Sequence, residues 1–341
     1  MTLLVIAPVK IARRFLLLLC VVALTCPWAT PAVSFAKTTA RQAAAANDDD
    51  DSTPAPKRKR VRKAKAAKPS HRNDDASDDA ATVPPAPAAL PVAGTAPRIA
   101  PNTRAASVIL IDARTGEVLY EKNADAQRAI ASTQKLLTAL IVAERGYLDQ
   151  SVTVAPADTY AEPTKLGFRA GETYPRMDLL RVLLVHSCND VARCLARDAG
   201  GSLENFAEIM NQKARSLGAI NSNFLNPNGL PMPGQYSTAR DLSLIARAAY
   251  ANPTIRSIVS IPHLVFRYAD GHTREFDNTN KVLRRLSYCN GMKTGYTDAA
   301  GHCLVSSATR PGRDVISVVL GDPKSHVWID SAALLAWGLS I

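Results

Sequence analysis

The sequence predicts an α+β fold, in which helices flank a mostly antiparallel sheet and an all-helical lobe is inserted between its strands. Three observations support this class. Residues 107–121 contain two short apolar runs separated by a turn. Helical apolar spacing dominates residues 177–250. Strand-like segments return after residue 263, before one closing helix. Early and late strands separated by helices imply one sheet built from both ends of the folded part, with the helices forming a second lobe.

Each expected element has a local justification. The stretch Asp112-Ala113-Arg114-Thr115-Gly116 supplies turn residues between strands at 107–111 and 117–121, which predicts a hairpin. The apolar run after Ser132 predicts a helix as far as Arg145, which Gly146 ends. The remaining spacing predicts a short strand at 151–154; helices at 179–184, 191–199, 206–217 and 242–249, interrupted by loops at 226–229 and 231–234; strands at 263–268, 273–276, 291–294, 302–307 and 315–320; and a helix at 327–339.

The N-terminal third differs in composition from the rest of the chain. Of 341 residues, 47% are hydrophobic, which is enough for a large core, but the net charge of +11 is unevenly distributed. Residues 1–36 have the features of an export signal: a basic flank of Lys10, Arg13 and Arg14, an apolar core at 15–25, and a small-x-small site that ends at Ala36. We expect cleavage after Ala36 and a location in the periplasm or cell envelope, with an uncleaved N-terminal anchor as the alternative.

Residues 37–105 have the composition of a disordered linker, and the folded part is expected at residues 106–341. Bulky apolar residues are scarce there, and an acidic block at 48–51, a basic block at 57–68, acidic residues at 74–79 and a Pro/Ala stretch at 84–97 follow one another. Such blocks are typical of solvated tails. The alternative is that residues 57–68 bind an anionic cell-wall or membrane surface, since an exported protein does not meet nucleic acid.

A serine and a lysine stand one turn apart at the start of the helix predicted after Ser132. In Ser132-Thr133-Gln134-Lys135 the two side chains share one helix face, so that the amine can reach the hydroxyl. A serine hydroxyl becomes a good nucleophile when an adjacent base takes its proton, and a lysine can be that base if burial or nearby positive charge keeps it neutral. This short motif is weak evidence when it stands alone.

Two further motifs strengthen it. Ser187-Cys188-Asn189 lies between two predicted helices, and Lys293-Thr294-Gly295 lies in a predicted strand. The order S-x-x-K, S-x-N and K-T-G is that of penicillin-binding proteins and class A β-lactamases. The three motifs together, in this order and behind an export signal, predict nucleophilic serine chemistry.

From about residue 105 to Ile341 the chain resembles the D-alanyl-D-alanine carboxypeptidase family, the low-molecular-mass penicillin-binding proteins. Besides the motifs, the resemblance rests on the stretches at 112–120, 187–190, 224–230, 236–239 and 291–297. It implies a β-lactamase/DD-peptidase-like fold. It also implies a substrate: peptidoglycan stem peptides ending in D-Ala-D-Ala, with the last D-alanine removed and with β-lactams as covalent inhibitors of the same serine.

The family's chemistry assigns a role to each motif residue. Ser132 would form the acyl-enzyme and Lys135 would accept its proton, while Ser187 and Lys293 would pass a proton to the leaving amine. Asn189 suits a substrate backbone amide and can orient Lys135.

The K-T-G strand is expected to bind the substrate. Lys293 and the Thr294 hydroxyl would hold the terminal carboxylate, and Gly295 would let the substrate strand approach. The resemblance places the oxyanion hole at the backbone N–H groups of Ser132 and Tyr296.

Two other functions stay open: a D,D-endopeptidase that cuts peptidoglycan cross-links, and a catalytically weak wall-binding protein on the same scaffold. The larger carboxypeptidases carry a second β-rich domain and a C-terminal anchor, which residues up to Ile341 do not include, so any membrane attachment is expected at the N-terminus. The stretch between Asn189 and Lys293 shows no convincing E-x-x-x-N, which argues against rapid β-lactam hydrolysis.

We expect no metal or other cofactor, and free thiols rather than disulfides. The histidines lack the H-x-x-x-H spacing of zinc peptidases. In the folded part, Cys188 and Cys194 should point to different faces of one helix, and Cys289 and Cys303 should be out of register on paired strands.

Overall fold

The computed structural model describes residues 92, 94 and 99–341. The predicted export signal and the charged blocks of the predicted linker lie outside the described residues. Packing begins shortly before Ala106, because Thr103 and Ala105 are buried. The backbone N–H of Arg104 donates to Asp330 at 2.6 Å, which fixes this first segment against the last helix.

A five-stranded antiparallel sheet confirms the predicted fold class. Its strand order is β2-β1-β9-β8-β7, so the first two and the last three strands of the sequence combine. The strands are β1 (Ser107–Asp112), β2 (Val118–Lys122), β7 (Cys289–Thr297), β8 (Gly301–Arg310) and β9 (Arg313–Asp322). Asp112 forms the predicted turn, since its Oδ1 accepts from the backbone N–H groups of Arg114 and Thr115 at 2.9 and 2.8 Å.

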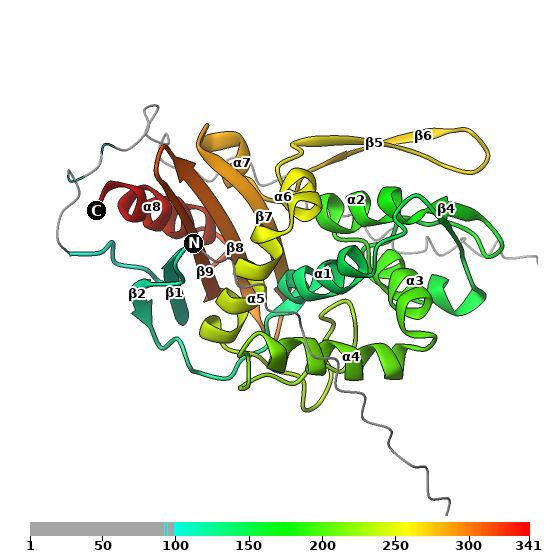
Figure 1. The fold of residues 1–341 in the computed structure, drawn as a ribbon, viewed down its shortest axis with the longest axis horizontal. Helices are drawn as coiled ribbons and strands as arrows, with labels where there is room; N and C mark the ends of the chain where they lie inside the picture. The colour runs from blue at the N-terminus through cyan, green and yellow to red at the C-terminus, as the bar shows by residue number, and fades with distance from the viewer. Residues whose placement is uncertain (1–91, 93, 95–98) are drawn as a thin grey trace, which may run out of the picture. The chain divides into compact units, whose positions relative to one another are not determined.

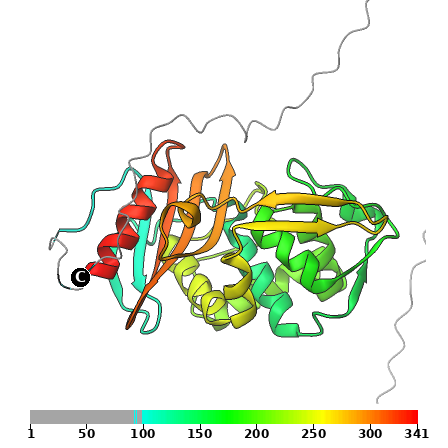
Figure 2. The ribbon, with the colours of Figure 1, turned by 90° about the horizontal axis from the view of Figure 1, so that it is seen from above.

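Helices cover both faces of this sheet (Figures 1 and 2). On one face, α8 (Val327–Ser340) packs Leu334, Leu335 and Leu339 against the sheet. On the other face, α5 (Ala239–Ala251) contacts β1 and β9. All six residues of β1 are buried, as expected for a strand with both faces covered.

The inserted lobe is mainly helical, although not all-helical as predicted, and α1 (Lys135–Arg145) lies at its centre. Around it are α2 (Arg176–His186), α3 (Asn189–Gly200), α4 (Leu203–Ser216) and α6 (Pro253–Val259). Two small sheets complete the lobe: β3 (Ser151–Thr153) with β4 (Thr173–Pro175), and the hairpin of β5 (His263–Arg267) and β6 (Thr273–Asp277), which runs past α2 (Figure 1).

Several short elements were not predicted. They are α6, α7 (Val282–Arg285), β4 and the 3₁₀ turns η2 (Ala131–Gln134) and η3 (Pro156–Thr159). The helix predicted from Ser132 therefore begins as a 3₁₀ turn and becomes α-helical at Lys135. The start of α6 does have a sequence signal: Asn252 accepts from the N–H groups of Thr254 and Ile255, and Pro253 follows it.

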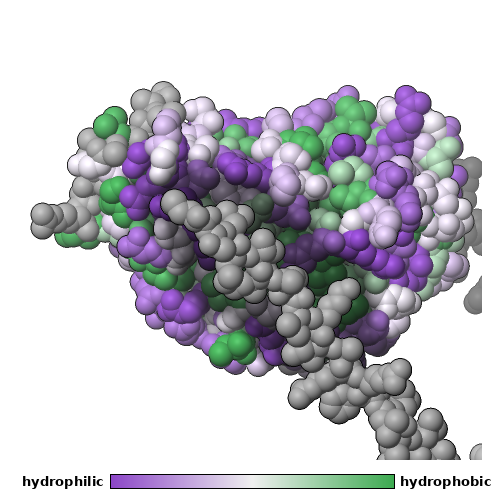
Figure 3. Space-filling model, viewed as in Figure 1, coloured by the Kyte–Doolittle hydropathy of each residue, from purple (hydrophilic) through white to green (hydrophobic). Residues whose placement is uncertain are grey.

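Hydrophilic and hydrophobic residues are mixed over the face of the molecule seen in Figure 3. The most exposed large apolar side chains between residues 99 and 341 come from separate elements, for example Tyr160, Ile220 and Val265. None of the helices in the described part of the chain is long and apolar enough to cross a membrane. The four cysteines in this part are free and buried, as predicted.

Candidate active site

The three motifs meet where the helical lobe adjoins the edge of the large sheet. Ser132 lies in η2, directly before α1; Ser187 and Asn189 lie where α2 gives way to α3; and Lys293 lies in β7. β7 is the last strand of the sheet and contacts η2 (Figure 1). Residues far apart in the sequence thus line one junction.

Lys135 makes the central contacts of this junction. Its side chain is fully buried, and its Nζ lies 2.7 Å from Oγ of Ser132, 2.7 Å from Oδ1 of Asn189 and 2.8 Å from the backbone oxygen of Asn228. The two carbonyl oxygens can only accept. A neutral amine has two protons for these two acceptors, and its lone pair then faces the hydroxyl of Ser132. The geometry suits an amine that takes the proton of Ser132.

The electrostatics favour this neutral amine. Burial lowers the pKa of Lys135 well below its usual value of 10.5, and the charge of Lys293 lowers it further. Lys293 is also fully buried, which lowers its own pKa to about 7. Two neighbouring buried amines cannot both be charged at low cost, so Lys135 is poised as a base.

Asn189 is held in place by the segment that precedes α2. Its side-chain amide donates to the backbone oxygen of Glu162 at 3.2 Å, and its backbone N–H donates to Thr164 at 2.8 Å. The next residue, Asp190, accepts from the backbone N–H groups of Leu166 and Gly167 at 3.0 and 2.9 Å. Oδ1 of Asn189 is thereby aimed at Lys135.

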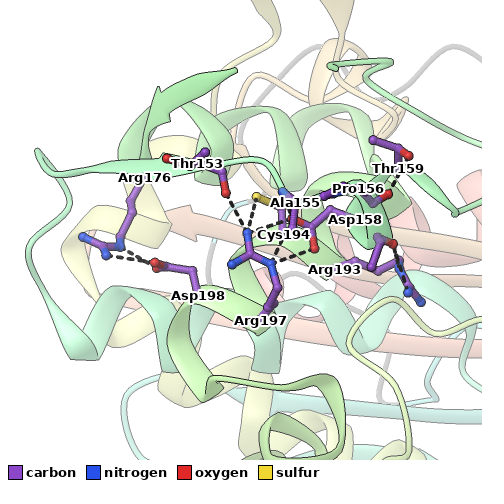
Figure 4. A network of polar contacts seen from close by, with 11 residues as sticks. Thr153, Ala155, Pro156, Asp158, Thr159, Arg176, Arg193, Cys194, Arg197 and Asp198 are labelled. Carbon is purple, nitrogen blue, oxygen red and sulfur yellow. Dashed lines mark hydrogen bonds and ion pairs between the residues drawn. The ribbon is translucent and has the colours of Figure 1, made fainter. Parts of the chain in front are cut away.

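A polar network on α3 holds the earlier half of that segment (Figure 4). The guanidinium of Arg197 contacts the carboxylate of Asp158 at 2.8–3.1 Å and donates to the backbone oxygen of Thr153 at 2.7 Å. Arg193 donates to the backbone oxygen of Ala157. The helix that begins with Asn189 therefore holds residues 153–167 along much of its length.

A loop at residues 226–230 supplies contacts that the sequence analysis did not predict. Its carbonyl oxygens accept from three side chains of η2 and α1: Asn226 from Gln134, Pro227 from Thr138 at 2.7 Å, and Asn228 from Lys135. The resemblance included this stretch, but a role for Asn228 had no signal, because it acts through its backbone oxygen.

Two glycines permit close packing around Ser132. A Cβ atom on Gly295 would lie 2.7 Å from the backbone nitrogen of Ser132. A Cβ atom on Gly229, whose φ is +83°, would lie 2.1 Å from the backbone oxygen of Ala131. In this structure Gly295 thus permits a close approach to the η2 turn that carries Ser132, which brings β7 beside the backbone N–H of Ser132.

The remaining motif residues surround these contacts. Ser187 caps the C-terminus of α2 in the left-handed region, with φ +72°, and Nζ of Lys293 donates to the backbone oxygen of Thr294 at 3.0 Å. Tyr296 is 55% exposed, and its ring stacks on that of His302 with the ring centroids 4.4 Å apart. Its hydroxyl donates a hydrogen bond to Asp298. Direct hydrogen bonds thus join Ser132, Lys135 and Asn189, while Lys293 acts on Lys135 through its charge.

Cys188, between the two S-x-N residues, is fully buried, and burial raises the pKa of its thiol. Its surroundings favour a protonated filler rather than a reactive thiolate.

Comparison with known proteins identifies relatives over most of the described part. A family model described as D-alanyl-D-alanine carboxypeptidase matches residues 94–324. The chain is 36% identical over 247 residues to the D-alanyl-D-alanine carboxypeptidase DacB2 of Mycobacterium tuberculosis, a match that covers 71% of this chain and 84% of that one. It is 32% identical to the D-alanyl-D-alanine endopeptidase of Escherichia coli K12, over 70% of this chain and 78% of that one.

The fold has solved counterparts as well. The crystal structure of the D-alanyl-D-alanine carboxypeptidase DacD from Francisella tularensis is similar with a TM-score of 0.67 and 31% identity, over 72% of each chain. The match spans less than two thirds of the carboxypeptidases DacF of Bacillus subtilis and DacC of Escherichia coli. The predicted resemblance and fold class are both confirmed.

Proposed function

The chain belongs to the D-alanyl-D-alanine carboxypeptidase family, and we propose that it removes the terminal D-alanine of peptidoglycan stem peptides through an acyl-enzyme on Ser132. The observation that carries this proposal is the set of three contacts at Nζ of Lys135, which leaves the lone pair of a neutral amine for Ser132.

In the acylation step, Oγ of Ser132 attacks the carbonyl carbon of the penultimate D-alanine while Lys135 accepts the hydroxyl proton. Negative charge then develops on the carbonyl oxygen. The backbone N–H groups of Ser132 and Tyr296 stabilise it, and the tight packing at Gly295 supports this role because it holds the two backbones together.

The leaving D-alanine needs a proton on its nitrogen. Lys135 holds the proton taken from Ser132, and Ser187 and Lys293 relay it to the amine as the C–N bond breaks, so that Lys135 is neutral again. Lys135 then takes a proton from the water that attacks the ester and returns it to Oγ of Ser132 as the C–O bond breaks, and the shortened peptide leaves with a new carboxyl group.

The substrate lies along the outer edge of β7, which is the edge strand of the sheet. An extended peptide can add to such an edge through backbone hydrogen bonds. Asn189 binds the backbone amide of the substrate, and Lys293 and the Thr294 hydroxyl bind its terminal carboxylate. Lys293 suits this role because it is buried beside the site, where a bound carboxylate would offset the burial that lowers its pKa and would stabilise the ammonium form.

The proposed substrate is part of the cell wall, which agrees with the export signal expected at residues 1–36. We further propose that the enzyme acts in the periplasm or envelope, that residues 37–105 link the signal to the catalytic domain, and that residues 57–68 bind an anionic wall or membrane surface. β-Lactams acylate Ser132 as substrate analogues.

A second candidate activity is the cutting of cross-links between stem peptides. It is favoured by the similarity to the D-alanyl-D-alanine endopeptidase of Escherichia coli, because the match covers 78% of the length of that endopeptidase.

Intact-protein mass after incubation with benzylpenicillin tests the proposal. The full chain should gain one adduct, Ser132→Ala should gain none, and the exposed Ser151→Ala should behave as the full chain. Release of D-alanine from a D-Ala-D-Ala pentapeptide supports the carboxypeptidase. An adduct combined with cleavage of cross-linked dimers alone supports the endopeptidase, and no adduct in the unmodified chain rejects both.

A further inference from the structure

A second threonine hydroxyl lies beside the hydroxyl of the K-T-G motif. Oγ1 of Thr294 and Oγ1 of Thr279 are 2.7 Å apart, although the residues are 15 positions apart in sequence. Thr279 is half-buried in the connection between β6 and α7. In the structure the hydroxyl of Thr294 donates to Oγ1 of Thr279. Each hydroxyl has one proton, so when the Thr294 proton turns to an acceptor outside the pair, Oγ1 of Thr294 can accept the proton of Thr279 in return.

The position of Thr279 is fixed by buried amides on either side. The side-chain amide of Asn278 donates to the backbone oxygens of Val259 and Ile261 at 3.2 and 2.9 Å. That of Asn280 donates to Oγ of Ser306 on β8 at 3.1 Å. Both asparagines are at most 2% exposed, so a shift of this turn would leave buried polar groups unpaired.

Thr279 also connects the two sides of the active site. Its backbone N–H donates to the backbone oxygen of Val185 in α2 at 3.1 Å, two residues before Ser187. Its hydroxyl contacts Thr294 in β7. A single residue thus joins the end of the helix that carries Ser187 to the strand that carries Lys293.

We propose that Thr279 is a positioning residue for recognition of the substrate's terminal carboxylate. When the carboxylate binds beside Lys293, the Thr294 hydroxyl turns from Thr279 to the carboxylate, and the Thr279 hydroxyl then donates to Oγ1 of Thr294 and holds it in this orientation. Because a hydroxyl that accepts one hydrogen bond is a stronger donor in the next, the pair binds an anion better than Thr294 alone. This inference rests on the proposed function and concerns which ligands the site prefers.

The experiment compares ligands with and without the carboxylate. Second-order rate constants of acylation by benzylpenicillin and by its methyl ester are measured from intact mass for the full chain, Thr279→Val and Thr279→Ser. Valine keeps the shape of threonine but removes the hydroxyl, and serine keeps the hydroxyl. The exposed Thr273→Val on β6 is the matched control.

We expect benzylpenicillin to acylate Thr279→Val about 10-fold more slowly than the unmodified chain, which is the effect of losing about one hydrogen bond to a charged group. The acylation rate with the methyl ester should change much less. Thr279→Ser should retain most of the preference for the acid. An equal loss with both ligands, or no loss, would overturn the proposal. Absence of acylation in the unmodified chain, or acylation of Ser132→Ala, would instead reject the proposed function.

Discussion

The ion pair between Arg197 and Asp158 gives a prediction whose size can be worked out from the structure (Figure 4). In Arg197→Met, the carboxylate of Asp158 would keep its hydrogen bond from the backbone N–H of Ala155 but lose its three contacts with the guanidinium, at 2.8–3.1 Å. The Asp158 side chain is 2% exposed, so its charge would be left buried. Removing one partner of a fully buried pair costs about 3–5 kcal/mol, and since 29% of Arg197 is exposed we expect ~3 kcal/mol.

Thermal unfolding of the full chain measures this effect. A loss of ~3 kcal/mol corresponds to a fall in Tm of roughly 6–12 °C for a domain of this size. Arg181→Met is the matched control, because its ion pair with Asp178 is more than 40% exposed on both sides and should contribute below about 1 kcal/mol. Adding Asp158→Asn to Arg197→Met should recover part of the loss, since the uncompensated charge disappears.

The same substitution should slow the chemistry. Residues 153–167 carry the carbonyl oxygens that hold Asn189, so their loosening frees Oδ1 of Asn189 from Lys135. We expect acylation by benzylpenicillin to slow by about 10-fold at a temperature at which the variant remains folded. If Arg197→Met is as stable as Arg181→Met, or acylates at the unmodified rate, the argument from this network is refuted.

Two further substitutions test the packing and the titration of the domain. Gly229→Ala should slow acylation about 100-fold, because its Cβ would displace the Ala131 carbonyl, whereas Gly171→Ala, with a similar φ and open space around it, should not. Burial, with the nearby charge of Asp330, raises the pKa of Asp322 to about 7. The folded state then holds a proton that the unfolded chain loses near pH 4, so the free energy of unfolding should fall as pH rises from about 4 to 7. Urea unfolding across this range should show the fall in the unmodified chain and a flatter profile in Asp322→Asn; equal profiles would exclude Asp322 as the source.

The layout of the fold could be predicted because its long elements have clear periodicity. The hairpin at the start, the helical lobe and the five late strands all appear where the apolar spacing placed them, but β5 and β6 pair as a separate hairpin and do not join the large sheet. Short elements such as α7 and β4 lack enough residues to show a period. Their place is decided by contacts with distant segments, which one sequence does not display.

The candidate site also has parts that the sequence alone shows and parts that depend on contacts between distant segments. Side chains in motifs of fixed spacing, such as Ser132 and Lys135, are visible in the sequence. The backbone oxygens of Glu162 and Asn228 are not, because any residue supplies a carbonyl oxygen and only the path of the chain decides where it points. Thr279 had no signal either, since its partner Thr294 lies on a different element.

Backbone strain is concentrated beside the motifs, and the buried contacts explain how it persists. Among the described residues, five that are not glycine have positive φ, and three of these are Ala131, Ser187 and Met292. Ala131 precedes Ser132, Ser187 is itself a motif residue, and Met292 precedes Lys293. Each such residue costs about 1–3 kcal/mol and persists only where its surroundings determine it strongly. The contacts that orient the amine of Lys135 cross from η2 to α3 and to the loop at 226–230, so they also resist relaxation of the η2 turn that carries Ser132. The direction of the lysine lone pair and the position of the nucleophile therefore depend on the same buried hydrogen bonds.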